Sequence, residues 1–137
     1  MLRVLATLIL LVTSAAAFAQ TPSERVEEFL RQVTTSESDK AMDRLFAGSG
    51  FAESKPQDIV TLKSQTKMAM GLYGLPLGIE KIREEDLSPS LKRLVYLQKF
   101  EKYPVAWEFY FYKPKDDWVI NTLNFKDQIG PLVGAKQ

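Results

Sequence analysis

The sequence predicts an α+β fold in which N-terminal helices pack on a curved four-stranded antiparallel sheet. Between Thr21 and Tyr73 the apolar residues recur at steps of three and four, which is the spacing of one helix face. After Pro76 the pattern changes to a period of two, which is typical of strands. Helices first and strands second is the order of domains whose helices gather on one face of an antiparallel sheet.

The first 19 residues are predicted to be a cleaved signal peptide. Met1-Leu2-Arg3 gives a short positive start, an apolar run follows over residues 4–12, and Ala17 and Ala19 form the A-x-A pattern of a signal-peptidase site. The alternative, a membrane anchor, needs about 20 apolar residues, which this run does not supply. We therefore expect one domain over residues 20–137. This domain is expected to be exported to the periplasm or outside the cell, with no membrane span once the signal is removed.

Cysteine and histidine are both absent from the sequence. The first absence excludes disulfides and thiolate chemistry, and the second removes the usual general base near neutral pH and the commonest zinc ligand. The mature part is neutral once Arg3 leaves with the signal, and it has no basic stripe of the kind that binds nucleic acid. We therefore predict no catalytic residue, no metal, no cofactor and no nucleic-acid partner.

The first helix is expected to begin at a capping box. Thr21 is the N-cap, Pro22 occupies the first turn, and Glu24 reaches back to the backbone of Thr21. The residues of its apolar stripe are Val26, Phe29, Leu30 and Val33.

Two further helices are expected before Pro76. One spans residues 39–46 with Ser38 as its N-cap, and the other spans residues 56–73 with Ser54 at the start of a capping box. The inner face of the longer helix consists of Ile59, Leu62, Thr66, Ala69 and Tyr73. We expect this helix to lie in the concavity of the sheet.

Four strands separated by short polar turns favour an antiparallel meander. They are residues 78–84, 91–103, 105–113 and 118–125. One face of the third strand is apolar and consists of Trp107, Phe109 and Phe111. Its other face is mixed and consists of Ala106, Glu108, Tyr110 and Tyr112. The apolar face is expected to meet the helices, and the mixed face is expected to be partly wetted.

The aromatic hairpin over residues 107–121, WEFYFYKPKDDWVIN, resembles the final hairpin of small exported members of the nuclear transport factor 2-like superfamily. The resemblance implies the cystatin-like cone of that superfamily. It also implies a pocket between the concave sheet face and the helices. Enzymes of the superfamily place a carboxylate or histidine there as base and a tyrosine or protonated acid at the oxyanion. Its members often dimerise through the open sheet face. The resemblance implies a fold and transfers no activity.

Five residues are candidates for lining such a pocket. Glu108 is the best carboxylate, since burial among aromatic rings raises the pKa of a carboxyl group as a proton-abstracting base requires. The alternative is that Glu108 lies on the wetted face and pairs with Arg93 or Lys99. The other candidates are Tyr73, Tyr96, Tyr110 and Tyr112. They form either a cavity wall or ordinary packing between sheet and helices.

Two other segments have alternative interpretations. Glu84-Glu85-Asp86 is expected in a turn, either as a calcium site or, by the usual fate of charge runs, as a solvated turn. The segment over residues 71–78 holds three glycines and a proline among apolar residues. It is either a mobile lip over the cone or a buried crossover.

The sequence favours an exported, non-catalytic module that binds a hydrophobic small molecule or a protein surface. One alternative is an isomerase-like or cyclase-like enzyme with a carboxylate in the pocket. Another is an interaction protein that forms a homodimer through the sheet face, with Tyr96, Tyr110 and Tyr112 on that face.

Overall fold

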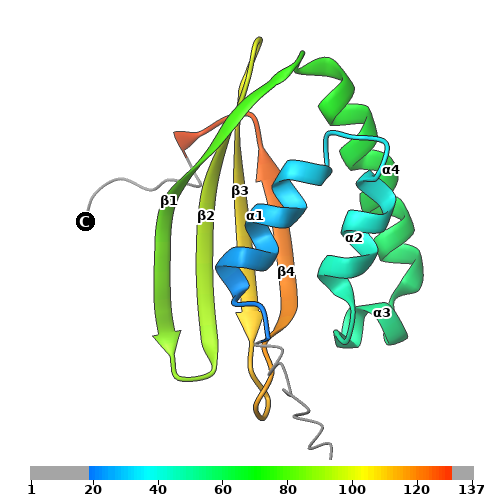
Figure 1. Ribbon diagram of the computed structural model, residues 1–137. Helices are drawn as coiled ribbons and strands as arrows, with labels where there is room; N and C mark the ends of the chain where they lie inside the picture. The colour runs from blue at the N-terminus through cyan, green and yellow to red at the C-terminus, as the bar shows by residue number, and fades with distance from the viewer. Residues whose placement is uncertain (1–18, 131–137) are drawn as a thin grey trace, which may run out of the picture.

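The structure is a computed structural model that describes residues 19–130, and the predicted signal peptide lies outside these residues except for Ala19. Four helices precede four strands (Figure 1). The helices are α1 (Pro22–Gln32), α2 (Ser38–Phe46), α3 (Gly50–Ser54) and α4 (Pro56–Leu72). The strands are β1 (Pro76–Ser88), β2 (Leu91–Phe100), β3 (Pro104–Tyr112) and β4 (Val119–Lys126). They form one antiparallel sheet in the order β1-β2-β3-β4, which confirms the predicted α+β fold class.

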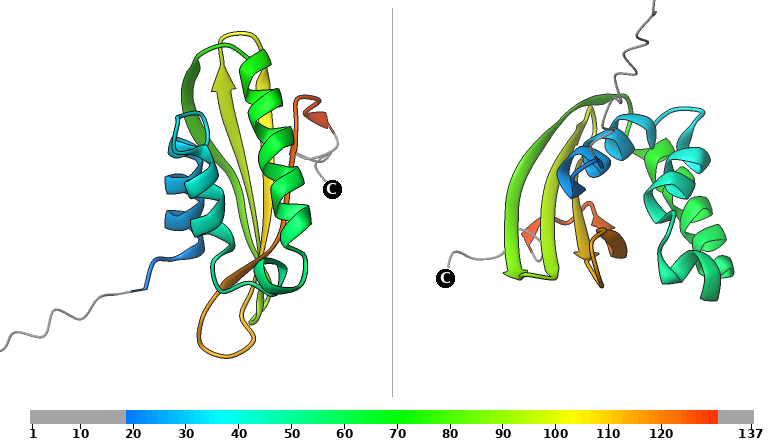
Figure 2. Two further views of the ribbon diagram at one scale, coloured as in Figure 1. Left: turned by 90° about the vertical axis from the view of Figure 1, so that its right-hand side faces the viewer. Right: turned by 60° about the horizontal axis from the view of Figure 1, so that its bottom comes forward.

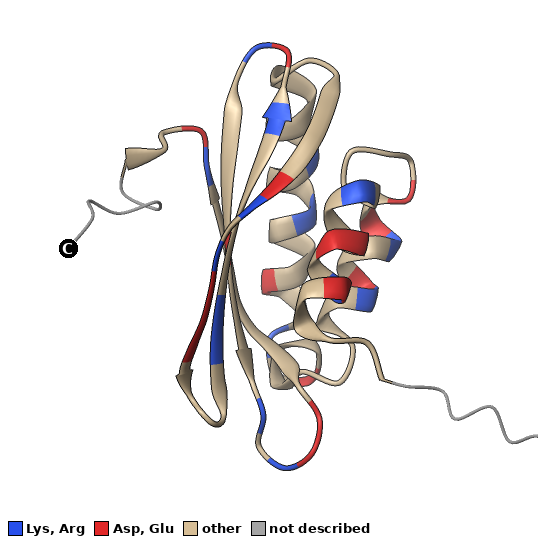
Figure 3. Ribbon diagram, turned by 60° about the vertical axis from the view of Figure 1, so that its left-hand side comes forward, with Lys and Arg blue, Asp and Glu red and all other residues tan. Residues whose placement is uncertain are grey.

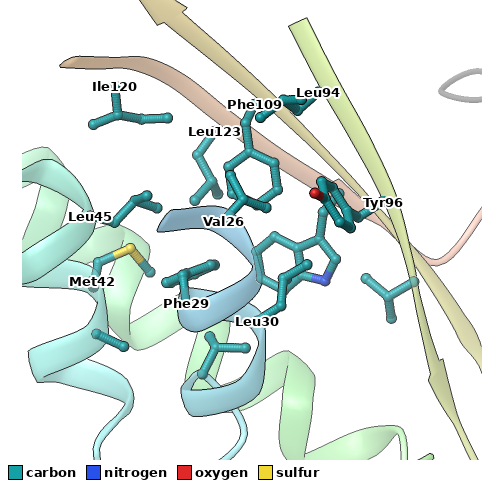
Figure 4. Packing of buried hydrophobic residues seen from close by; sticks show 14 of the residues in the cluster. Val26, Phe29, Leu30, Met42, Leu45, Leu94, Tyr96, Phe109, Ile120 and Leu123 are labelled. Atoms are coloured by element: carbon teal, nitrogen blue, oxygen red, sulfur yellow. The ribbon is translucent and has the colours of Figure 1, made fainter. Parts of the chain in front are cut away.

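Helix α1 begins as its capping box predicts. The backbone nitrogen of Glu24 donates to Thr21 Oγ1 over 3.2 Å, and the backbone nitrogen of Thr21 donates to Glu24 Oε2 over 2.8 Å. The apolar stripe faces the sheet, and the Phe29 ring packs edge-on against Trp107 and Phe109 at 5.5 and 5.9 Å between ring centroids. Val26 and Leu30 are completely buried beside it (Figure 4).

The helix that crosses the middle of the sheet is α1, whereas the expectation placed the 56–73 helix there (Figure 1). Helix α4 lies to the side, beyond β4, with α2 next to it (Figure 2). Its Ile59, Leu62 and Ala69 still pack against the common core. The physical reason is the distribution of apolar residues. Those of α1 form one stripe, whereas α4 also carries Val60 and Met68 on its exposed side, so no single face dominates.

The helix ends differ from the expectation in two places. Ser38 is the first residue of α2, and the N-cap is Glu37, whose side chain makes no capping hydrogen bond. Ser54 does not cap α4, because its hydroxyl donates to the carbonyl of Gly50 over 2.6 Å. That bond closes α3, a single turn that the sequence does not predict because five residues are too few to show a helical period.

Strand β1 is longer than predicted and includes Glu84, Glu85 and Asp86, so the expected acidic turn is wrong. Lysine and arginine side chains of β2 neutralise these acids across the strands. Lys92 Nζ lies 3.3 Å from Glu84 and 3.0 Å from Asp86, and Arg93 Nη1 lies 3.5 Å from Glu85. This pairing explains why the acidic run continues a strand.

The glycine-rich segment from Gly71 to Gly78 fits neither expected alternative. Leu72 and Leu75 are exposed, so it is not a buried crossover. It is not a free lip either, because the carbonyls of Tyr73 and Leu75 accept hydrogen bonds from the β2–β3 turn over 3.0 and 3.1 Å. Gly74 has a φ of +83°, the left-handed conformation that favours glycine, and this turns the chain from α4 into β1.

One buried polar side chain joins α1 to the sheet. Gln98 is only 2% exposed. Its Nε2 donates to the carbonyl of Leu30 over 3.0 Å, and its Oε1 accepts from Trp107 Nε1 over 2.9 Å. Both bonds lie in the centre of the apolar core, where an unpaired polar group is costly.

Candidate functional site

A pocket of about 370 Å³ lies between the α3–α4 segment and strand β4, and we call it the β4 pocket. Its volume is at the lower end of the range for ligand sites, about 300–1,000 Å³. Its apolar wall consists of Phe46, Phe51, Ile59, Leu62 and Leu123. The centre of the concave sheet face, by contrast, is filled by α1 and the rings around Phe29.

Local structure places this wall. Phe46 ends α2 and Phe51 lies in α3, and their rings meet edge-on at 6.2 Å between centroids. Pro56 then starts α4, whose first two turns bring Ile59 and Leu62 toward β4. The short α3 therefore has a clear role. It turns the chain so that the end of α2, the start of α4 and the edge of β4 surround the same pocket.

The rim of the pocket is polar and consists of Asp58, Thr61, Gln65, Asn121, Thr122 and Asn124. Both hydroxyls of the rim are already engaged: Thr61 Oγ1 donates to the carbonyl of Gln57 over 3.1 Å, and Thr122 Oγ1 donates to Asn121 Oδ1 over 2.8 Å. The side chains of Asp58, Gln65 and Asn124 make no hydrogen bond or ion pair with any residue between 19 and 130. Apolar walls with a few unengaged polar groups are typical of ligand sites.

The five residues predicted from the sequence do not line this pocket, and they lie on both faces of the sheet. Tyr96 pairs with Trp107 on the helix side, whereas Glu108, Tyr110 and Tyr112 point to the opposite side. Tyr73 is the C-cap residue that follows α4, and it packs on Phe100 at 5.6 Å between ring centroids. Because a sheet separates its two faces, no single cavity contains all five.

The two helix-side tyrosines are held by acids. Tyr96 Oη donates to Glu27 Oε1 over 3.0 Å, and Tyr73 Oη donates to Asp127 Oδ2 over 3.3 Å. Burial is the largest cause that raises the pKa of each phenol, and the neighbouring carboxylate raises it further, although a hydrogen bond with Ser23 partly opposes the rise at Tyr96. Both tyrosines are therefore neutral hydrogen-bond donors: Tyr96 fastens the sheet to α1, and Tyr73 fastens the end of α4 to the segment after β4.

Glu108 pairs with Arg93, which confirms one of the two expected partners. Its Oε2 lies 2.7 Å from Arg93 Nε and 2.6 Å from Nη2. The expected wet surroundings are wrong, because Glu108 is only 9% exposed. Burial opposes the charge of Arg93, but the hydrogen bond and charge of Glu108 outweigh it and raise the pKa of Arg93. The pair is thus a structural ion pair on the sheet face away from the helices.

The sequence does not predict the β4 pocket, because the residues that line it come from three separate segments. The one available signal was in strand β4, where asparagine and threonine alternate with apolar residues so that neither face is cleanly polar. In the structure that irregularity coincides with a register shift between Tyr110 and Phe111, opposite Asn121.

Comparison with protein-family models, with curated proteins and with solved structures finds no match to this chain. Between residues 19 and 130, no group of three or more acidic side chains is placed to hold a metal ion. Over the same residues, no helix has both the length and the apolar character that a bilayer crossing requires.

Proposed function

We propose that this chain is an exported, non-catalytic module that binds a hydrophobic ligand in the β4 pocket. The observation that carries the proposal is an open apolar cavity beside an otherwise filled core, with unengaged polar side chains at its rim. Five apolar residues supply burial for a ligand, and the amide of Gln65 supplies hydrogen bonds that orient it.

The position of the carboxylates argues against the enzymatic alternative. An isomerase-like or cyclase-like mechanism needs a base inside the pocket with a raised pKa. Glu108, the sequence candidate, lies on the opposite sheet face and is bound by Arg93. Asp58 is at the pocket rim but is exposed on the first turn of α4.

The sheet-face homodimer receives less support than the pocket. Tyr96, one of its three expected tyrosines, points to the helices. The middle of that face is occupied by the Arg93–Glu108 pair, and Arg83 extends the charged surface through its 3.3 Å contact with Glu85. Charged residues are depleted in the cores of protein interfaces.

We propose in addition that the chain is a distant member of the nuclear transport factor 2-like superfamily. Support comes from the order of helices and strands, the meander topology and the aromatic hairpin over residues 107–121. A series of intermediate sequences, each matching the next, would strengthen the assignment. Such a series leading to another superfamily would overturn it.

One experiment tests both export and binding. The full sequence is expressed in a bacterium and the protein is recovered from the periplasm, where its mass should show a cut after Ala19. The protein is then titrated with 1-anilinonaphthalene-8-sulfonate by calorimetry. Thr61→Trp, which fills the β4 pocket, should weaken binding about tenfold or more, equivalent to about 1.4 kcal/mol.

The matched control is Val60→Trp, because Val60 is the next residue, is 51% exposed and does not line the pocket. It should bind the probe as the unmodified protein does. Equal binding by both variants, or no binding by the unmodified protein, would refute the pocket. Recovery of the protein only in the cytoplasm with an intact N-terminus would refute export.

A further inference from the structure

We propose that the ligand of the β4 pocket is an extended peptide segment that adds as a fifth strand to the open edge of β4. This inference rests on the proposed function, because it identifies the kind of ligand that the same pocket binds. Peptides that bind by strand addition gain main-chain hydrogen bonds from a sheet edge and specificity from pockets for alternate side chains.

The two edges of the sheet have different character. Edge strand β1 carries a dense run of both charges, namely Glu80, Lys81, Arg83, Glu84, Glu85 and Asp86, along the side nearest the viewer in Figure 3. Charged side chains of this kind discourage pairing with another strand. Edge strand β4 has no charged residue from Val119 to Phe125 and no proline. The sequence therefore protects one edge and leaves the other open.

A groove runs along the open edge. A second pocket, of about 340 Å³, adjoins the β4 pocket and shares Phe51 and Asn121 with it. Together the two are lined by every residue from Val119 to Asn124. Successive side chains of a strand point to opposite faces of the sheet, so a cavity on one face would contact only every second residue. Because all six consecutive residues line the two pockets, the groove runs along the edge of the strand.

The backbone of β4 presents polar groups to that groove. In the described sheet β4 pairs only with β3, so alternate backbone N–H and C=O groups of β4 point away from the sheet. A rigid apolar molecule that covered them would leave them without hydrogen bonds, which is unfavourable. An extended peptide satisfies them, and about six residues at 3.3 Å each span the length of the groove.

The charges beside the groove define the peptide further. Asp58 lies at the rim of the β4 pocket and forms no ion pair within residues 19–130. Lys55 lines the adjoining pocket, where its Nζ is 5.1 Å from the Phe51 ring centroid. A peptide that complements this groove has apolar side chains facing Leu62 and Leu123. It also has a lysine or arginine beside the carboxylate of Asp58.

The test uses a capped peptide of about seven residues that alternates valine and threonine and has one lysine, a length that matches the groove. A second peptide has the same side chains but N-methyl groups on alternate backbone amides. We expect the first peptide to slow amide hydrogen exchange over residues 119–124. We expect N-methylation to weaken binding about tenfold or more, since it removes the peptide's donors.

Asp58→Asn provides a charge test without touching the core, because Asp58 is exposed. This substitution should weaken binding of the lysine peptide several-fold and leave binding of a peptide with glutamine in place of lysine unchanged. Glu101→Gln removes another exposed charge, in the β2–β3 turn away from the groove, and should change the binding of neither peptide. A variant that still shows native exchange in β3 is folded, so a change in binding then reports the groove.

The outcomes separate the two proposals. If 1-anilinonaphthalene-8-sulfonate binds in a Thr61-dependent way but the peptide does not bind, the peptide inference fails and the proposed function stands. Equal binding of the plain and N-methylated peptides also overturns strand addition. If neither the probe nor the peptide binds, both proposals fail.

Discussion

At the scale of single residues, Gln98 shows how a polar side chain can fix the position of a helix on a sheet. Its two ends bond Leu30 of α1 and Trp107 of β3, and no water is needed to complete either bond. Each of those partners is buried, so neither has an alternative in solvent. The side chain therefore specifies where α1 lies along the strands as well as how strongly it packs.

We predict that Gln98→Leu lowers the free energy of unfolding by about 2–4 kcal/mol, since it strands the Trp107 N–H and the Leu30 carbonyl without partners. Urea unfolding followed by tryptophan fluorescence measures the change. Gln57→Leu, an exposed substitution of the same kind, should stay within about 0.5 kcal/mol of the unmodified protein. Similar stabilities for the two variants would contradict the role of Gln98.

Within the sheet, sequence patterns predicted residue contacts only where strand alternation decides them. The apolar face of β3 and the partnership of Glu108 with a β2 base follow from period two and cross-strand pairing. The sheet face on which the Tyr96 side chain lies does not follow from these rules, because it depends on which β2 residue lies opposite Trp107. A shift of one residue reverses every face, and nothing local sets that register.

At the scale of elements, β1 depends on charge pairing for much of its length. Glu84 accepts hydrogen bonds from Lys81 Nζ over 2.9 Å, Lys92 Nζ over 3.3 Å and Ser23 Oγ over 3.2 Å. The bond from Lys81, followed by those from Lys92 and Ser23, lowers the pKa of Glu84 below its ordinary value of 4.5 despite partial burial. Hydrogen bonds to a carboxylate favour its charged form.

We predict that Glu84→Gln flattens the acid side of the stability profile. Because the pKa is lower in the folded state, the stabilisation by Glu84 is complete above about pH 4.5 and is lost as the pH falls through the folded-state pKa. The loss should not exceed about 1 kcal/mol, since more than a third of the side chain is exposed. Urea midpoints between pH 7 and 2 measure it.

Glu53→Gln is the control, because Glu53 forms no ion pair with residues 19–130 and its variant should keep the original profile. Parallel profiles for the unmodified protein and Glu84→Gln would contradict the assigned cause.

Elements with strong local signals were predictable, and those held by distant partners were not. The Thr21–Glu24 capping box fixed the start of α1 because its determinants are four adjacent residues. The extent of β1 was misjudged because an acidic run resembles a turn until its bases on β2 are known. The β4 pocket depends on α3, and the placement of that single turn is a tertiary matter.

At the scale of the whole molecule, the chain divides into a tightly packed part and a looser one. Helix α1 and the sheet share the large aromatic residues, whereas α4 contacts mainly α2 and α3 at the side of the sheet (Figure 2). Only Ile59, Thr66 and Met70 are buried in the 17 residues of α4. The Thr66 hydroxyl has no hydrogen-bond partner in the described structure, which weakens that helix further.

We predict that α4 opens without global unfolding, because segments with few buried contacts open at lower free energy than the core. Native-state hydrogen exchange should give α4 amides opening free energies at least about 1.4 kcal/mol below those of β3, a tenfold difference in protection. The amide of Phe109, at the centre of the sheet, is the internal reference. Equal values in α4 and β3 would instead show one cooperative unit.

The β4 pocket lies between these two parts, so binding should couple them. A ligand present at about 100 times its Kd stabilises the state that binds it by about 2.7 kcal/mol. Since opening of α4 removes the wall formed by Ile59 and Leu62, exchange in α4 should slow about 100-fold under those conditions, up to the limit set by global unfolding. At the same ligand concentration Thr61→Trp should reduce this slowing about tenfold or more, and Val60→Trp should retain it. If a bound ligand slowed exchange in the sheet but not in α4, the site would lie elsewhere on the molecule.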